Sequence, residues 1–588
     1  MSMNILKKIY FLISLSGEVR IIIYFIFLLI GAIFELLSIG LIFPFITLAL
    51  GSELPDNLIF INKFLSFISY NLSISYLTAA IIFLLSIFII KNIFLIYYNW
   101  WRFDFSNVVQ LNLSQRLFSF YLSRPLIFHL QKNSSILIRN LISEISQVQK
   151  ILISVLTFFF EFVVFISILS MLIIAEPMAA LLSITILGTS SLIYFLLTKK
   201  KISQWGKIRL KQSSKYLKNI TQSINSIKEI IVTGRIKLFL DIHYNQRKTL
   251  ASIMQKFGII DIIPKYLFEI LAILAFSAII LFFSKQEKSH AEVLPLIGLF
   301  VMAAYRLMPS VTRILSAFQG IVYKLPTIDN LYDELRCQKK EVKDFDSFFK
   351  FQENITSRYF FRDKIEIKNL IYYFASSKIK ILDHVSFTIN KGDMVGIVGD
   401  SGSGKSTLIN LLMGLLTTDE EFIFIDDQPI KKILNIWRND IGYVAQSPYI
   451  VDDTIRNNIG FGIPENMIDD NKIDRCIEFS QLKKFILSKS KGINTRVGET
   501  GSNISGGQLQ RIALARALYH DPSILIFDEP TSALDSNIET QIIKDLKKMK
   551  GNKTIILVSH KKSTLQYCDQ IIEIKKGKVA NIKYNKLR

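Results

Sequence analysis

The glycine-rich segment 399–406 carries residue types that bind nucleotide phosphates. It reads Gly-Asp-Ser-Gly-Ser-Gly-Lys-Ser and matches the pattern G-x-x-x-x-G-K-[ST]. The apolar run Val395–Val398 before it predicts a strand, and the run after it predicts a helix. Glycines let backbone N–H groups turn towards phosphate oxygens, and a helix N-terminus adds partial positive charge. We therefore expect a phosphate-binding loop formed by Gly399, Ser401, Gly402, Ser403, Gly404, Lys405, Ser406 and Thr407.

Two residues of this loop and two downstream carboxylates have separate predicted roles. Lys405 should reach the β- and γ-phosphates, and the Ser406 hydroxyl should bind Mg²⁺. Downstream, the apolar run Ile524–Phe527 ends in Asp528 and Glu529. Asp528 is placed to join the magnesium site, and Glu529 to polarise the attacking water. The alternative for this run is a strand that ends in an acidic turn.

Composition predicts that much of the chain lies in a membrane. Hydrophobic residues make up 50% of the 588 residues, and charged residues make up 20%. A chain of this length is expected to form at least two domains. The formal net charge of +22 could indicate nucleic acid, but basic cytoplasmic loops of a membrane protein give the same sum. We expect no nucleic-acid partner, and the three cysteines and six histidines show no metal-ligand spacing.

Six segments are long and apolar enough to cross a bilayer as helices. They are residues 21–50, 77–98, 151–175, 178–198, 258–284 and 291–316. The connections at 102–150 and 199–257 are long and basic, whereas Lys63 is the one basic residue of 51–76. The excess of positive charge predicts that both long loops and both termini lie in the cytoplasm.

Three segments outside the spans have predicted positions at the membrane or near a partner domain. Each long loop has a central break, at Arg124-Pro125 and at 233–235. A short cross-helix at each break would be placed to contact a cytoplasmic domain, and two solvated charged helices are the alternative. The external segment Leu54–Leu72 is apolar at helical spacing but too polar to span. We expect an amphipathic helix on the outer leaflet, with a packed lid or a plain loop as the alternative.

Ionisable side chains inside the spans are candidate functional residues, because a charge at mid-membrane is costly. They are Glu35, Lys91, Glu161, Lys265, Glu269 and Arg306. Arg306 and Arg313 lie seven residues apart and share a helix face, and Pro309 between them would open the helix. Two guanidinium groups on one wall of a cavity suit a phosphate or pyrophosphate group of a substrate. Snorkelling at the cytoplasmic end, or pairing with a carboxylate, is the alternative.

The C-terminal half resembles ATP-binding cassette (ABC) transporters, specifically exporter-type half-transporters. The resemblance depends on motifs that occur in the family's order between the phosphate loop and the C-terminus. In chain order they are Gln446 of the Q-loop, Val497–Gly501 before the signature, Ser505, Gly506, Gly507 and Gln508 of the signature, Ser532–Asp535 of the D-loop, and the switch histidine His560. Ile504 stands where the signature usually has Leu.

The resemblance implies a multidomain membrane protein with the fold of an exporter half. It implies a six-helix all-α transmembrane domain at 1–325, a linker at 326–362 and an α/β P-loop ABC nucleotide-binding domain at 363–588. The implied activity is ATP hydrolysis, with Mg²⁺, coupled to transport. In the family two cassettes close head to tail, so that each ATP lies between one chain's phosphate loop and the other's signature. A homodimer in the bacterial inner membrane is expected, with the ATP-binding domain in the cytoplasm.

The resemblance also assigns roles to individual residues of this sequence. The implied catalytic residues are Gln446, Glu529 and His560, and the implied magnesium ligands are Ser406, Gln446 and Asp528. The signature residues Ser505 to Gln508 would contact the ATP bound by a second chain. An aromatic ring usually stacks on adenine, and Phe374 is the best match, with Tyr373 as the alternative.

Two short stretches resemble flippases of lipid-linked oligosaccharides in bacterial protein glycosylation (PglK type). Glu35–Leu48 is similar to the first span of that group, and Tyr305–Ile314 is similar to the sixth. The resemblance implies a polyprenyl-pyrophosphate glycan as substrate, with Arg306 and Arg313 at its pyrophosphate. A peptide or bacteriocin exporter, an exporter of lipid A or drugs, and an ATP-gated channel or regulatory module are the alternatives.

Overall fold

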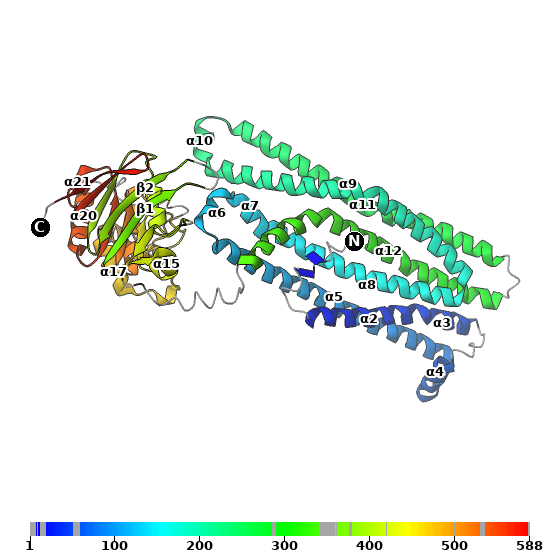
Figure 1. The fold of residues 1–588 in the computed structure, drawn as a ribbon. Helices are drawn as coiled ribbons and strands as arrows, with labels where there is room; N and C mark the ends of the chain where they lie inside the picture. Colours follow the sequence, from blue (N-terminus) through cyan, green and yellow to red (C-terminus); the bar gives the residue numbers. More distant parts are fainter. Residues whose placement is uncertain are drawn as a thin grey trace. The chain divides into compact units, whose positions relative to one another are not determined.

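The chain forms two compact units (Figure 1). The computed structural model describes residues 7–8, 10–11, 19–50, 59–284, 290–341, 359, 361–374, 379–418, 420–498, 501, 504–529 and 536–585. The first unit comprises Met1–Arg124 and His129–Lys343, and the second comprises Pro125–Phe128 and Asp344–Arg588. The short segment Pro125–Phe128 therefore packs with the second unit, although its neighbours along the chain belong to the first.

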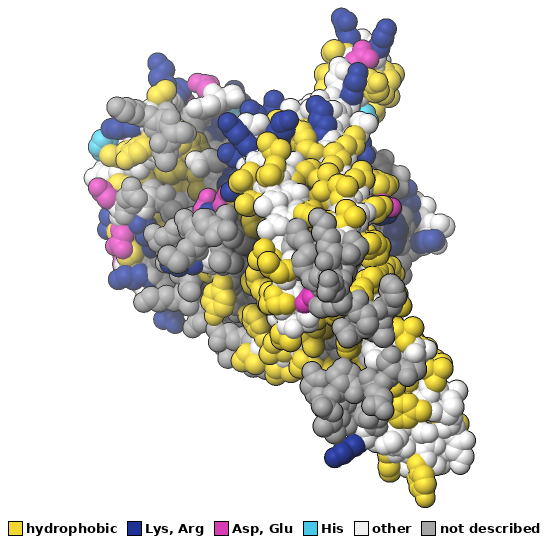
Figure 2. Space-filling model, turned by 90° about the vertical axis from the view of Figure 1, so that its right-hand side faces the viewer, with side chains coloured by type: hydrophobic (Ala, Val, Ile, Leu, Met, Phe, Trp, Pro, Cys, Tyr) yellow, Lys and Arg dark blue, Asp and Glu magenta, His cyan; other side chains and the backbone are white. Residues whose placement is uncertain are grey.

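The described part of the first unit is helical, and its long helices run side by side (Figure 1). The long helices are α2 (Val19–Gly40), α5 (Tyr76–Leu122), α8 (Ile145–Ala175), α9 (Pro177–Asn225), α11 (Ile236–Ser284) and α12 (His290–Glu341). The shorter helices are α3 (Ile42–Ala49), α4 (Ile59–Leu72), α6 (Leu126–Gln131), α7 (Ser134–Arg139), the π-helical turn η2 (Asn140–Glu144) and α10 (Ile227–Val232). Large exposed hydrophobic side chains cover much of the visible helical surface, as expected for a surface that faces lipid (Figure 2).

Four helical stretches among the described residues are long and apolar enough to cross a membrane. They are Arg20–Ala49, Tyr76–Leu122, Ser134–Ala175 and Val293–Leu335. The sequence predicted six segments, and the remaining two, 178–198 and 258–284, lie in α9 and α11, which are outside this set of four. Both predicted loop breaks are present, because α5 and α6 are separate helices and α10 lies between α9 and α11.

One segment differs from the range expected from the sequence. Helix α12 continues to Glu341, so residues 326–341 of the predicted linker 326–362 are helical. The helix continues because Ile328, Leu331 and Leu335 are buried at helical spacing. Most of the remaining linker, and residues 54–58 of the predicted amphipathic segment, lie outside the described residues.

The second unit contains two sheets among its described residues. The four-stranded antiparallel sheet has the order β2 (Leu382–Asn390), β1 (Lys364–Tyr372), β4 (Ile423–Ile425) and β5 (Gln428–Pro429). The six-stranded sheet has the order β10 (Lys578–Tyr584), β9 (Gln570–Lys575), β3 (Met394–Val398), β8 (Thr554–Val558), β7 (Ile524–Asp528) and β6 (Ile441–Val444). All neighbours in this sheet are parallel except β10 and β9. The central strands are almost wholly buried, which explains their continuous apolar runs.

Helices pack these sheets into two hydrophobic cores. The helices are α14 (Lys405–Leu412), α15 (Ile430–Arg438), α16 (Ile455–Ile459), α17 (Asp470–Phe479), α18 (Lys483–Leu487), α19 (Gly506–Tyr519), α20 (Ser536–Met549) and α21 (Lys562–Leu565). The first core contains Leu408 and Leu412 of α14, packed with Trp437. The second contains Ile512 of α19. The phosphate loop and the signature motif therefore begin helices that pack in different cores.

Candidate nucleotide-binding site

The predicted site residues follow four strands that are consecutive in the six-stranded sheet. The order is β3, β8, β7 and β6. The phosphate loop follows β3, His560 follows β8, Asp528 ends β7, and Gln446 follows β6. Because these strands are parallel, their carboxyl ends meet at one edge, which is where open α/β sheets bind ligands.

The phosphate loop has a backbone that glycine alone adopts without strain. Gly402 and Gly404 have φ values of +78° and +103°, in the left-handed region. Gly404 is the N-cap of α14, and a Cβ atom on it would lie 2.9 Å from Leu382 Cδ2 and 3.0 Å from the Ile381 carbonyl oxygen. The loop thus turns sharply into the N-terminus of α14, where backbone N–H groups are available to an anion.

The polar side chains of the loop fit a phosphate ligand. The Lys405 side chain is buried, and its Nζ donates to the carbonyl oxygens of Gly399 (2.6 Å) and Asp400 (2.9 Å). Its ammonium group is therefore held against the loop itself. The Ser403 hydroxyl is buried and has no hydrogen-bond partner among the described residues. A buried hydroxyl without a partner is costly, and a phosphate oxygen would accept from it.

Gln446, Glu529 and His560 form one cluster. Gln446 Nε2 donates to Glu529 Oε2 over 2.7 Å, although the two residues are 83 positions apart. On the other side, His560 Nε2 lies 3.4 Å from Glu529 Oε1. Glu529 has a φ of +49°, which is uncommon for a residue with a side chain, and its N–H donates to the carbonyl oxygen of Val558 on β8. Strained backbone of this kind occurs at functional sites, and here it fixes the direction of the Glu529 carboxylate.

Asp528 is close enough to both Glu529 and Lys405 for their charges to act on its carboxyl group. Burial raises the pKa of the Asp528 carboxyl above its usual range, the negative charge of Glu529 raises it further, and the Lys405 ammonium opposes both effects. The Ser406 hydroxyl is exposed at the start of α14. A hydroxyl, a carboxylate and the Gln446 amide oxygen are the hard oxygen ligands that Mg²⁺ prefers, so this donor set fits the ion.

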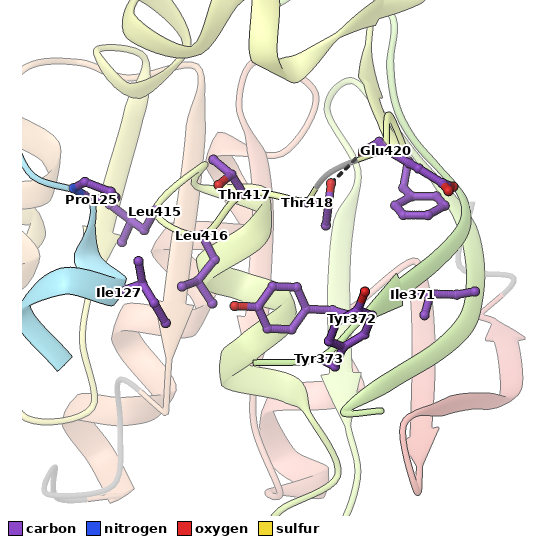
Figure 3. A pocket seen from close by; sticks show the side chains of 11 residues that line it. Pro125, Ile127, Ile371, Tyr372, Tyr373, Leu415, Leu416, Thr417, Thr418 and Glu420 are labelled. Carbon is purple, nitrogen blue, oxygen red and sulfur yellow. Dashed lines mark hydrogen bonds between the residues drawn. The ribbon is translucent and has the colours of Figure 1, made fainter. Parts of the chain in front are cut away.

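The two candidate adenine-stacking rings have different surroundings. Phe374 is half-buried and packs edge-on against Tyr372, with ring centroids 5.4 Å apart. Tyr373 is 53% exposed and lines a cavity of about 440 Å³ together with Tyr372 (Figure 3). Pro125 and Ile127 form another part of that cavity's wall. Phe374 stays the predicted adenine-stacking residue, with Tyr373 as the alternative.

The signature motif forms the N-terminus of α19. Ser505 is the N-cap, and its hydroxyl accepts from the Gln508 N–H (3.4 Å) while the Gln508 side chain accepts from the Ser505 N–H (3.0 Å). This capping box is visible in the sequence as S-x-x-Q, a signal that the sequence analysis did not use. Ser505 and Gly506 are exposed. The D-loop residues Ser532–Asp535, and Glu499 and Thr500 before the signature, lie outside the described residues.

Comparisons with known proteins agree with this geometry. Residues 382–532 match the sequence profile of a family described as ABC transporter. Across 96% of both chains, the structure is similar to a bacterial Atm1-family ABC exporter with ATP bound, with a TM-score of 0.75 and 20% sequence identity. The chain has the fold of an ABC exporter. Its first unit corresponds to the helical transmembrane domain of such exporters, and its second to the α/β ABC nucleotide-binding domain.

Curated relatives match this chain over part of their length. An ATP-dependent lipid A-core flippase of Bordetella avium (strain 197N) is 40% identical over 219 residues, which are 37% of this chain and 37% of the relative. An ATP-dependent lipid A-core flippase of Desulfotalea psychrophila is 31% identical over 386 residues, which are 64% of this chain and 65% of the relative. The matched part is therefore less than two thirds of either relative.

The arginines predicted to contact a substrate are paired with carboxylates. Arg306 Nη2 lies 3.0 Å from Glu35 Oε1, and Arg306 Nη1 lies 3.1 Å from Glu161 Oε2. Arg313 Nη1 lies 2.7 Å from Glu161 Oε1. The Ser310 hydroxyl also donates to Glu161 (2.7 Å). Carboxylate pairing, the alternative considered from the sequence, is thus present for both arginines.

Charge in this network is not fully balanced. Lys91 Nζ lies 3.6 Å from Glu35 Oε2, so three cations share two carboxylates. The Arg313 side chain is 58% exposed, whereas Glu161 is 2% exposed. The surplus positive charge is therefore accessible at Arg313. Glu35 and Glu161 are recognisable in the sequence as ionisable residues within the spans. Their pairing with arginines is not recognisable there, because they lie on other helices.

A buried carboxylate near His560 was also missed by the sequence analysis. Glu539 of α20 accepts from Lys561 Nζ (2.8 Å) and from the Thr564 hydroxyl (3.3 Å). Lys561 directly follows His560, so this contact connects the segment that carries His560 to α20. Nothing in the sequence marks Glu539, because a single acidic residue near the start of a helix is common.

Proposed function

We propose that this chain is one half of an ATP-driven exporter that moves a phosphorylated glycolipid across the bacterial inner membrane. The observation that supports ATP hydrolysis is the meeting of Gln446, Glu529 and His560 at the sheet edge that carries the phosphate loop. The fold supports the coupling of hydrolysis to transport.

Residues of the phosphate loop bind the nucleotide in this proposal. Lys405, the Ser403 hydroxyl and the N–H groups at the start of α14 hold the phosphates, and Phe374 supports the adenine. Ser406, Asp528 and Gln446 would hold Mg²⁺, which neutralises charge on the phosphates when it is bound.

Glu529 is the residue that acts on water in this proposal. Its carboxylate accepts a hydrogen bond from the attacking water and orients it, while the contact with Gln446 keeps the carboxylate in place. His560 lies on the other side of Glu529 and donates to the γ-phosphate.

A second copy of the chain completes the site. The signature helix α19 packs in a different core from α14, and its N-terminus is exposed with Ser505 and Gly506 at the tip. An exposed helix N-terminus attracts a phosphate, so the signature of one copy can bind the ATP held by the other. We therefore propose a homodimer with two equivalent ATP sites, on the cytoplasmic side of a multi-pass membrane protein.

Two phosphorylated glycolipids are candidate substrates. The names of the curated relatives favour lipid A-core, which was an alternative in the sequence analysis, over the lipid-linked oligosaccharide first expected. The network around Arg306 and Arg313 favours an anionic group on the substrate, because its surplus positive charge is accessible at Arg313. It does not distinguish lipid A-core from the lipid-linked oligosaccharide, since both carry phosphate groups. The polyprenyl-pyrophosphate glycan therefore stays as the second candidate.

Reconstitution in liposomes tests this proposal. We expect ATP-dependent movement of fluorescent lipid A-core between leaflets, with movement lost in Glu529→Gln and retained in Glu478→Gln, which changes an exposed carboxylate on α17. Movement of polyprenyl-pyrophosphate oligosaccharide alone would replace the first substrate by the second. Movement of neither lipid by a protein that hydrolyses ATP would refute the glycolipid assignment and leave the ATPase assignment intact.

A further inference from the structure

We propose that a pocket between α9 and α12 binds the headgroup of an anionic phospholipid of the cytoplasmic leaflet. The pocket has a volume of about 610 Å³ and lies wholly within the first unit. It is separate from the nucleotide site and contains neither Arg306 nor Arg313. Its ligand is a lipid of the surrounding bilayer, so the inference depends on the predicted membrane orientation but not on the identity of the transported substrate.

One wall of the pocket is cationic. Helix α9 contributes Lys199, Lys200 and Lys207, and all three side chains are exposed. Among the residues that the structure describes, none of the three is paired with a carboxylate. The sequence contains no Asp or Glu between Glu176 and Glu229, so α9 itself offers no counter-charge. These three lysines can therefore bind an anion from outside the protein.

The opposite wall is apolar. Helix α12 contributes Phe318, Ile321, Val322 and Leu325, which repeat at helical spacing. Leu196 of α9 extends this wall and is 62% exposed. A free phosphate gains nothing from such a wall, whereas a phospholipid presents a charged headgroup and an acyl chain side by side. The two walls therefore favour a lipid over a soluble anion.

The position of the lysines along α9 matches the level of lipid headgroups. The apolar segment predicted to span the membrane ends at Thr198, and Lys199 follows directly. Basic pockets between helices at this level bind anionic headgroups. Ser203 and Gln204 also line the pocket and can donate hydrogen bonds to phosphate or glycerol oxygens.

Helices α9 and α12 approach closely at residues adjacent to those that line the pocket. A Cβ atom on Gly206 would lie 2.1 Å from the Tyr323 carbonyl oxygen, so only glycine allows this approach. Gly206 directly precedes Lys207, and Tyr323 directly follows Val322. The cationic and apolar walls are therefore held by one rigid helix–helix contact.

Binding of fluorescent phosphatidylglycerol to the purified full-length protein in detergent, without ATP, tests the proposal. We expect at least tenfold weaker binding of phosphatidylcholine. The triple variant Lys199→Gln, Lys200→Gln, Lys207→Gln should lose most phosphatidylglycerol binding, and the corresponding Lys→Arg triple should retain it. The matched control changes Lys211, Lys215 and Lys218, which are exposed on the same helix outside the pocket, and should bind within twofold of wild type.

Three outcomes would overturn the proposal. Wild-type affinity in the Lys199/Lys200/Lys207 variant would show that the pocket does not bind the lipid. An equal loss in the Lys211/Lys215/Lys218 control would show general attraction to a basic surface. Full competition by millimolar inorganic phosphate would show that a soluble anion is the ligand instead.

Discussion

Removal of the Glu161 carboxylate should destabilise the transmembrane unit. Glu161 is 2% exposed and bonds to Arg306, Arg313 and Ser310. In Glu161→Gln the side chain keeps its size, and an amide oxygen at the Oε2 position remains a neutral acceptor for Ser310 and Arg306. The new NH₂ group then faces the N–H donor of Arg313, and both arginines lose the negative charge. Two charge-assisted contacts are therefore lost, and the network changes from a surplus of one positive charge to a surplus of two.

The size of the effect follows from the exposure of the two arginines. The Arg313 pair is largely solvated on its arginine side, so its loss costs about 0–1 kcal/mol. The Arg306 side chain is 14% exposed, and breaking a buried pair costs about 3–5 kcal/mol. Arg306 keeps Glu35 at 3.0 Å, which places the cost near the lower end of that range. We expect a loss of about 3 kcal/mol in total, or about 6 °C in Tm.

Thermal unfolding of the full-length protein in detergent, followed by intrinsic fluorescence, measures this effect. Glu269→Gln is the matched control, because Glu269 is an exposed carboxylate in the predicted fifth span. Its Tm should stay close to wild type. The double variant Glu161→Gln, Arg306→Gln should be more stable than the sum of the single effects predicts, because each single variant already loses the Glu161–Arg306 contact. Equal Tm values for Glu161→Gln and Glu269→Gln would refute the reasoning.

Four further predictions concern the nucleotide site. Glu529→Gln should lower kcat by about 10²–10⁴-fold and leave ATP binding intact. Phosphate release measures the turnover, and a fluorescent ATP analogue measures the binding. Normal turnover, or an equal loss in Glu478→Gln, would contradict the assignment of Glu529. Lys405→Ala should weaken ATP binding by about 10–100-fold in the same binding assay, since it removes a charge-assisted contact; unchanged affinity would exclude Lys405 from the site. Because the pKa of Asp528 is raised, a proton competes with Mg²⁺ for its carboxylate at a higher pH than for an ordinary Asp. The gain in ATP affinity that Mg²⁺ provides should therefore shrink as the pH falls from about 7.5 to about 5. Asp528→Asn should abolish that gain at both pH values. A gain that does not change with pH would exclude Asp528 as a ligand. Glu539→Gln should lower kcat by about twofold to fivefold without changing ATP affinity, because the Lys561 contact is half-exposed, and Glu539→Asp should recover part of the loss.

Local features of the nucleotide half could be predicted from the sequence because neighbouring residues determine them. The phosphate loop needs a strand before it, a helix after it and glycines with positive φ, and all of these lie within about twenty residues. The capping box of Ser505 and Gln508 is equally local. Buried parallel strands such as β7 are recognisable because both faces are covered and the run is continuously apolar.

The names of the curated relatives favour a substrate class that was an alternative in the sequence-based prediction, and helix α12 continues beyond the predicted span. The short stretches at Glu35–Leu48 and Tyr305–Ile314 resemble one group of flippases, whereas the curated relatives carry the name of another. Helix α12 extends 16 residues into the predicted linker, because buried apolar residues continue beyond the span on a helix that leaves the membrane region. The apolar composition that marks a span ends at the bilayer boundary. The buried apolar face that packs α12 continues beyond that boundary.

Residue type and short spacing are enough to identify which residues can bind phosphate, act on water or carry charge in the membrane. Tertiary structure alone decided which of them meet. The order β3, β8, β7 and β6 brings Gln446 and His560 to opposite oxygens of Glu529. Packing of α2, α8 and α12 pairs Arg306 with Glu35 and Glu161. Contacts between residues far apart in the chain depend on strand order and helix packing, which no local pattern contains.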